Sequence, residues 1–111
     1  MADCAFCSLA GDPDFAAIHR DDDVMAFDDL NPQAPVHFLV IPRQHIETIA
    51  GVTNDHLLGS MFEVANRVAR DRAVFDSGYR LVLNSGPDAG QTVHHVHLHV
   101  LGGRKLTWPP G

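Results

Sequence analysis

The segment VHHVHLHVL, residues 93–101, alternates histidine with aliphatic residues. His95, His97 and His99, here termed the histidine row, are separated by single apolar residues. Side chains of a β-strand point alternately to its two faces. We therefore expect a strand over residues 92–101 with three imidazoles on one face and core residues on the other. His94 falls on the core-facing side of this pattern unless the strand begins irregularly.

The rest of the chain predicts a sheet and one helix to support this strand. Further strands are predicted by short apolar runs bounded by Pro, Gly and Asp, at 24–27, 36–42 and 79–84. Apolar residues at i, i+3, i+4 spacing predict one helix over 54–74, capped by Thr53 or Asn54. The pattern predicts an α+β fold with a mainly antiparallel sheet, in a single domain of residues 1–111.

Charge and hydropathy exclude several classes of protein. The formal net charge is −6, which argues against a protein that coats DNA or RNA, although a local pocket can still bind a small anion. No apolar run approaches the roughly 20 residues that span a bilayer. The N-terminal segment MADCAFCSLA lacks the pattern of a signal peptide. We therefore expect a cytoplasmic protein without nucleic-acid polymer or membrane partners.

Three interpretations of the histidine row remain open from the residues alone. It is an exposed sheet face without a role, part of a three-histidine metal site, or a catalytic row acting at phosphorus. Spacing does not separate the last two. The preceding loop NSGPDAGQT contains glycines and small polar residues that can turn backbone N–H groups onto an anion. This context favours phosphorus chemistry.

Several segments resemble one known family. The row with its neighbours fits the pattern His-Φ-His-Φ-His-Φ-Φ, with Φ hydrophobic, of the histidine-triad (HIT) superfamily of nucleotidyl hydrolases and transferases. The resemblance is greatest to the Hint branch, whose members are nucleoside phosphoramidases. It is carried by the segments FDDLNPQAPVHFLVIPRQHI, YRLVLNSG, GQTVHHVHLHVLGGR and TWPPG. The resemblance implies a HIT-like fold with about five strands and one main helix. It also implies hydrolysis of purine nucleoside phosphoramidates, AMP or GMP linked through nitrogen to an amine or lysine.

The resemblance implies a role for each histidine of the site. His97 would attack phosphorus and carry the nucleotide as a covalent intermediate. His99 would bond the phosphate and help protonate the leaving amine. His95 would orient the row and support charge on His97, and His37 would reach in from the neighbouring strand. No cofactor would be required for catalysis.

The resemblance also implies which residues hold the substrate. Asp29 would accept the ribose hydroxyls, as a carboxylate can for two vicinal hydroxyls. The phosphate and leaving group would be held by Asn84, Gly90, Gln91 and Thr92. The purine would lie in an apolar slot formed by Phe6, Leu9, Phe27 and Leu30. The alternatives are that Leu9, Phe27 and Leu30 are plain core, that Asp29 is a solvated residue of an acidic loop, and that Asn84 is a turn residue.

The resemblance implies a homodimer whose two sheets join across a two-fold axis. Trp108 in the C-terminal tail would then shape the leaving-group pocket of the partner subunit. The residues alone are compatible with this assembly, because an open sheet in a small domain leaves an edge to cover.

The two cysteines, Cys4 and Cys7, form a C-x-x-C motif that is half of a zinc site. In some superfamily members such a pair binds zinc with two histidines, which here would be His45 and His95. The alternative is a pair of reduced thiols. His94 stands where close relatives often carry an aromatic residue, and no role follows for it.

Two other functional classes compete with the phosphoramidase. One is a non-catalytic module that binds a purine nucleotide or a protein partner with the same pocket. The other is a metal-dependent hydrolase with zinc in the histidine row.

Overall fold

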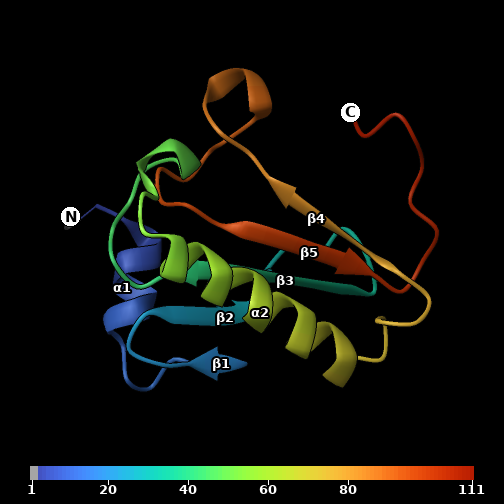
Figure 1. Ribbon diagram of the computed structural model, residues 1–111, viewed down its shortest axis with the longest axis horizontal. Coiled ribbons are helices and arrows are strands. Elements are labelled where there is room, and N and C mark those ends of the chain that lie inside the picture. The colour runs from blue at the N-terminus through green and yellow to red at the C-terminus, as the bar shows by residue number, and fades with distance from the viewer. Residues whose placement is uncertain (1–2) are drawn as a thin grey trace.

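The computed structural model describes residues 3–111, which form a five-stranded antiparallel sheet with two helices (Figure 1). The helices are α1 (Ala5–Gly11) and α2 (Asp55–Asp71), and the short 3-10 helices are η1 (Ile49–Gly51) and η2 (Pro87–Ala89). The strands, in the spatial order β1-β2-β3-β5-β4, are β1 (His19–Arg20), β2 (Val24–Asp28), β3 (Val36–Pro42), β4 (Tyr79–Leu83) and β5 (Leu98–Gly102). This architecture confirms the predicted α+β fold.

The central strand β3 organises the sheet. Its sequence VHFLVIP is apolar on both faces apart from His37, as expected for a strand covered on both sides. It pairs with β2 through Met25 opposite Ile41 and with β5 through Leu39 opposite His99. These registers fix which face each histidine of β3 and β5 occupies.

The two faces of the sheet pack against different helices. Helix α2 lies across one face (Figure 1), where it covers the residues Val24, Ala26, Phe38, Val40, Val96, Leu98 and Val100. Helix α1 packs on the other face, against Met25, Phe27, Leu39 and Ile41. The histidine row alternates with the α2-facing residues and therefore faces the α1 side.

Helix α2 forms because its apolar residues recur on one side and its first turn is capped. The Asn54 side chain accepts hydrogen bonds from the backbone N–H groups of His56 (2.9 Å) and Leu57 (3.2 Å). Asp55 in the first turn suits the positive end of the helix dipole. Of the two predicted caps, Asn54 is the one used.

Two details differ from the sequence-based expectation. The last strand begins at Leu98 rather than at residue 92, because residues 93–95 form a bend that turns the chain into the sheet. His94 consequently does not face the core and is exposed. Helix α1 and the two-residue strand β1 were not predicted, since both are too short to show a clear periodicity. Within residues 3–111, no helix combines the length and apolarity needed to cross a membrane.

The close contact between β5 and Val74 predicts a stability difference between two glycine substitutions. A Cβ on Gly102 would lie 2.9 Å from the Cβ of Val74, whereas a Cβ on Gly59 in α2 would meet no atom within 4 Å. We expect Gly102→Ala to lower the free energy of unfolding by about 1–3 kcal/mol through overpacking. The matched control Gly59→Ala should raise it by about 0.5–1 kcal/mol. Urea denaturation measures both, and equal effects would contradict this packing.

Candidate active site

His97 lies at the centre of the candidate site and has one defined tautomer. Its Nδ1 lies 2.8 Å from the backbone carbonyl oxygen of His95. A carbonyl oxygen can only accept, so Nδ1 carries a hydrogen, and in the neutral ring Nε2 then carries the lone pair. The residue is 7% exposed. The neutral form of this ring presents an Nε2 lone pair that can attack an electrophile.

His95 is fully buried, at 0% exposure, and both ring nitrogens face defined partners. Its Nε2 donates to the carbonyl oxygen of Pro42, the last residue of β3, at 2.7 Å. Its Nδ1 therefore carries a lone pair, and it faces the Sγ atoms of Cys4 (3.4 Å) and Cys7 (3.5 Å). His95 thus connects the N-terminal helix, the end of β3 and the backbone that orients His97.

His37 and His99 are brought together by the strand register. His37 pairs with Leu101 and Leu39 pairs with His99, so the two histidines are diagonal neighbours on the same face. Nε2 of His37 lies 2.9 Å from Nδ1 of His99. The rings of His97 and His99 also pack closely, with centroids 5.0 Å apart. Three imidazoles therefore meet in one network, closer than the spacing along an extended strand alone suggests.

A backbone donor sets the tautomers of this pair. The N–H of Gln33 donates to Nδ1 of His37 at 3.0 Å, so the hydrogen of a neutral His37 is on Nε2. That Nε2–H donates to Nδ1 of His99, which leaves the hydrogen of His99 on its Nε2. Next to the Nε2 lone pair of His97, the site therefore holds an Nε2–H donor on His99.

The surroundings keep three of the histidines neutral. Burial, reinforced by the neighbouring His97 and His37, lowers the pKa of His99 to about 4. Burial also lowers the pKa of His37, although the Asp29 carboxylate opposes this shift. The pKa of His95 is lowered mainly by burial, against the Pro42 carbonyl. Desolvation favours the uncharged imidazole in each case.

Asp29 lies directly after β2 and points toward the histidines. Its Oδ1 accepts the N–H of Asn31 at 2.8 Å, and its Oδ2 lies 3.4 Å from Nε2 of His37. The carboxylate is partly exposed. It remains accessible to hydroxyl groups of a ligand beside the row.

The Gln91 side chain is committed to the protein itself. Its Nε2 donates to the carbonyl oxygens of Glu47 (2.7 Å) and Val93 (3.1 Å), and its Oε1 accepts the N–H of Gly86 (2.9 Å). Both amide hydrogens are in use, so this side chain shapes the loop and has no free N–H for a phosphate. Gly90, at φ 86°, provides the left-handed turn that ends η2 just before it.

The apolar residues predicted to wall a purine divide into two groups. Phe6, Leu9 and Phe27 gather between α1 and β2, and the ring of Phe6 lies 5.2 Å from that of His97 by their centroids. Leu30 and Trp108 are 96% and 80% exposed and lie outside this cluster in the single chain. Asn84, which follows β4, is half-buried, and Thr92 is exposed.

Four side chains form a group with the chemistry of a zinc site. The donor atoms of Cys4, Cys7, His45 and His95 all lie within 4.8 Å of one another. Nδ1 of His45 lies 3.2 Å from Sγ of Cys7. A sulfur and a nitrogen on one tetrahedral zinc ion are separated by about 3.6 Å, so these distances fit the ion closely. Burial, then Cys4, raises the pKa of the Cys7 thiol, and a bound cation would reverse that preference.

A second group of possible ligands, Asp29, His37 and His99, also lies within 4.8 Å. The Gln33 N–H argues against a metal here. This N–H donates to Nδ1 of His37, so Nδ1 must carry a lone pair and the hydrogen of the neutral ring lies on Nε2. A metal ion in this group would have to bind that same Nε2. The geometry of this group suits hydrogen bonding rather than metal coordination.

Comparison with known proteins then decides the family. A model of the HIT domain family matches residues 12–106. The chain belongs to the HIT family. A HIT-like protein of Synechocystis sp. is 49% identical over 98 residues, which cover 86% of this chain and 85% of that protein.

Solved HIT structures support the same assignment. A HIT family hydrolase from Legionella pneumophila superposes with a TM-score of 0.91 at 44% identity, and covers 97% of this chain and 99% of its own. A histidine triad protein from Clostridium difficile superposes with a TM-score of 0.89 at 36% identity, over 96% of each chain.

Several backbone groups and arginines of the site were missed by sequence reasoning. The carbonyl of Pro42 and the N–H of Gln33 are backbone groups, so the residue types at these positions do not indicate their roles. Arg20 and Arg43 both donate to the carbonyl oxygen of Ala10, at 3.2 and 3.0 Å, and so hold the end of α1 against the sheet. Arg43 directly follows the predicted strand end at Pro42, which is the one signal that could have drawn attention to it.

The lowered pKa of His99 predicts an acid-sensitive fold. Because the folded state resists protonation down to about pH 4 and an unfolded histidine titrates near 6.5, the unfolded state binds more protons between these values. The contribution of His99 to stability is therefore complete above about pH 6.5 and declines as the pH falls toward 4. Urea denaturation across this range should show a shallower dependence for His99→Gln. The control His56→Gln, at an exposed site, should show the same pH dependence of unfolding free energy as the unaltered protein. The same pH dependence in His99→Gln as in the unaltered protein would contradict the prediction.

Proposed function

We propose that this protein is a hydrolase of the Hint type that cleaves purine nucleoside phosphoramidates through a covalent intermediate on His97. The single observation that carries the proposal is the contact of His97 Nδ1 with the His95 carbonyl oxygen at 2.8 Å, which selects the neutral tautomer with its lone pair on Nε2. Family membership and the hydrolases among its structural relatives support hydrolysis at the coarse level.

In the first step, Nε2 of His97 attacks the phosphorus and forms an N–P bond. The bond between phosphorus and the substrate nitrogen breaks, and the leaving amine takes a proton from solvent while the Nε2–H of neutral His99 donates a hydrogen bond to the phosphate. The His97 ring becomes positively charged and keeps its Nδ1–H on the His95 carbonyl oxygen. That oxygen stabilises the charge because it accepts a stronger, charge-assisted hydrogen bond.

In the second step, a water molecule attacks the phosphorus from the position that the amine has left. The bond between phosphorus and His97 breaks, and His97 returns to its neutral form. One hydrogen of the water leaves to solvent as a proton, which balances the proton taken up by the amine, and His99 keeps its Nε2–H because its Nδ1 accepts from His37. The balance is a phosphoramidate and water giving a nucleoside monophosphate and a free amine.

The nucleotide itself would be held on the α1 side of the sheet. Phe6, Leu9 and Phe27 provide apolar surface for a purine next to His97, and Asp29 provides a carboxylate for the ribose hydroxyls. Asn84, Gly90 and Thr92 lie at the loop that leads into the row. Leu30 would close on the base only when a ligand draws its loop inward. AMP and GMP, and their phosphoramidates, both fit this description.

We also propose a homodimer in which the sheet continues across a two-fold axis. Strand β4 is one of the two edge strands of the sheet, and it is only half-buried along its whole length. Leu81 and Leu83 of this strand are partly buried hydrophobic residues, and a second copy would cover the edge that carries them. Trp108, 80% exposed, would then reach the leaving-group side of the partner's site. A cytoplasmic location remains a prediction from the sequence.

The residues present fit a structural zinc ion. Cys4, Cys7, His45 and His95 would hold it, and it would supply a rigid link between the start of α1 and the histidine row. The protein's own residues carry out the catalytic steps. The Pro42 carbonyl fixes the Nδ1 lone pair of His95 toward the ion, as outer hydrogen bonds commonly do at zinc sites.

Loss of the His97 imidazole should abolish turnover. We expect His97→Ala to reduce hydrolysis of adenosine 5′-phosphoramidate by at least about 10³-fold, because no other lone pair replaces the attacking Nε2. Binding of AMP, measured by calorimetry, should persist. The exposed control His56→Ala on α2 should keep full activity. Unchanged turnover in His97→Ala would refute the mechanism, and AMP binding without turnover in the unaltered protein would favour a non-catalytic nucleotide-binding module.

The four-donor cluster predicts zinc content independently of catalysis. The protein purified under reducing conditions with Zn²⁺ should contain one zinc ion per chain by elemental analysis. Cys7→Ser should lose it, since a serine hydroxyl does not replace a thiolate ligand, whereas His97→Ala should retain it. If chelation removed the zinc and abolished turnover while the fold persisted, the protein would be a metal-dependent hydrolase, which would contradict the mechanism proposed here.

A further inference from the structure

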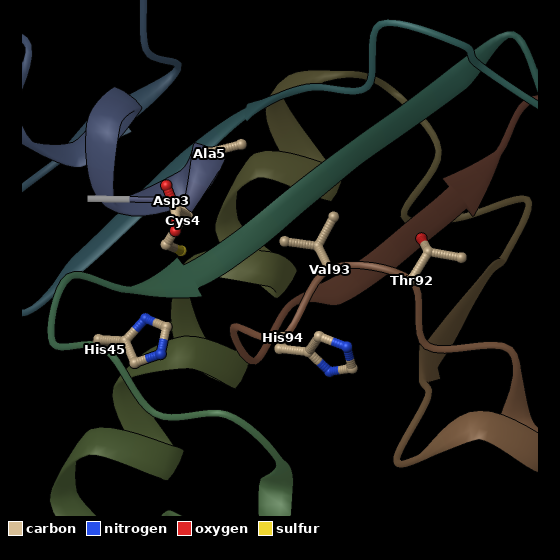
Figure 2. A pocket seen from close by; sticks show the side chains of 7 residues that line it. All are labelled: Asp3, Cys4, Ala5, His45, Thr92, Val93 and His94. Atoms are coloured by element: carbon tan, nitrogen blue, oxygen red, sulfur yellow. The ribbon is translucent and has the colours of Figure 1, made fainter. Parts of the chain in front are cut away.

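A cavity opens beside the four-donor cluster on the side of the N-terminus. It has a volume of about 420 Å³, and its walls include Asp3, Cys4, His45, Thr92, Val93 and His94. Figure 2 shows that these residues come from three separate segments: the start of α1, the chain after β3 and the chain before β5. None of the catalytic roles proposed above uses Asp3 or His94.

Two of the four donor residues line this cavity directly. Cys4 and His45 belong both to the cavity wall and to the cluster. His95, in contrast, is fully buried, so an ion that reaches its Nδ1 must first pass one of the other donors. The cavity therefore connects solvent to the open side of the cluster.

The outer part of the cavity adds two further ligand types. Asp3 supplies a carboxylate and His94 an imidazole, and both residues are exposed. Carboxylate oxygen and imidazole nitrogen are ordinary ligands of zinc. An ion arriving from solvent meets these two groups in the same cavity as Cys4 and His45.

A second cavity reaches the cluster from another side but suits a cation less well. It has a volume of about 500 Å³ and contains only one donor of the cluster, Cys7, together with Asp22 and Arg43. Arg43 is held there by its bonds to the carbonyl oxygens of Asp21 (3.0 Å) and Ala10 (3.0 Å). A fixed guanidinium group repels an approaching divalent cation.

We propose that the cavity lined by Asp3, Cys4, His45 and His94 is the route by which a thiophilic divalent cation such as Zn²⁺ enters and leaves the cluster. His94 and Asp3 act as transient ligands on this route. They replace water on the ion one ligand at a time, before Cys4 and His45 take it over. The inference rests on the zinc site proposed above and requires nothing of the phosphoramidase activity.

The route predicts a kinetic effect without a change in affinity. His94 is outside the four donors, so removing it leaves the bound state as it is and raises the barrier to uptake and release alike. We expect His94→Phe to slow both rates by roughly tenfold, equivalent to about 1.4 kcal/mol of barrier, with an unchanged dissociation constant. Asp3→Asn should slow both rates in the same direction.

The experiment follows zinc exchange in the full chain under reducing conditions. Zinc-loaded protein is mixed with a chromophoric chelator to measure release, and metal-free protein is mixed with Zn²⁺ to measure uptake. The matched control is His56→Phe, which alters an exposed histidine of α2 outside the cavity. Equilibrium competition with the chelator gives the dissociation constant of each variant, and circular dichroism verifies that each is folded.

The possible results distinguish a failure of the proposed entry route from a failure of the zinc site itself. Slow exchange in His94→Phe, with His56→Phe matching the unaltered protein, supports the proposal. Exchange at the unaltered rate in both His94→Phe and Asp3→Asn contradicts it. Weaker affinity with unchanged uptake would make His94 a ligand of the bound ion and also contradicts it. Absence of zinc binding in the unaltered protein removes the site itself, and with it the route.

Discussion

The hydrogen bond from Nδ1 of His97 to the carbonyl oxygen of His95 is the constraint on which the rest of the site depends. It selects the tautomer that leaves Nε2 free, and it is held because His95 is fully buried. That burial is tolerated because both His95 nitrogens have partners, the Pro42 carbonyl on one side and the thiols on the other. The conformation of the central histidine is therefore set by residues from three distant parts of the chain.

The sheet makes this arrangement possible because core residues and the site histidines project from opposite faces of β5. One face of β5 supplies Leu98 and Val100 to the core under α2, while His99 points to the opposite face, opposite Leu39. Burial on that face lowers the pKa values of His37, His95 and His99, while the neighbouring Asp29 remains partly exposed. Desolvation raises the nucleophilic character of such a site, since the uncharged ring is the form that attacks phosphorus.

The sequence predicts the parts of the fold that depend on local pattern. The bounds of β3 are those expected, because a continuous apolar run ends at Pro42, and Asn54 caps α2 as expected. The alternation of the histidine row predicts its common face, although regular strand begins only at Leu98. Helix α1 and the Gln33 N–H that sets His37 depend on tertiary contacts that no local pattern encodes. The grouping of Cys4 and Cys7 with two distant histidines came from resemblance, and the geometry accommodates it.

The most direct test of the account is to trap the covalent intermediate. The protein is mixed with adenosine 5′-phosphoramidate, quenched within the first turnover at alkaline pH, where bonds between phosphorus and histidine persist, and digested for mass spectrometry. We predict a peptide that carries one added adenylyl group, with the modification on His97. Turnover that proceeds with no adduct at any quench time, or with the adduct on another residue, would contradict the central role of His97.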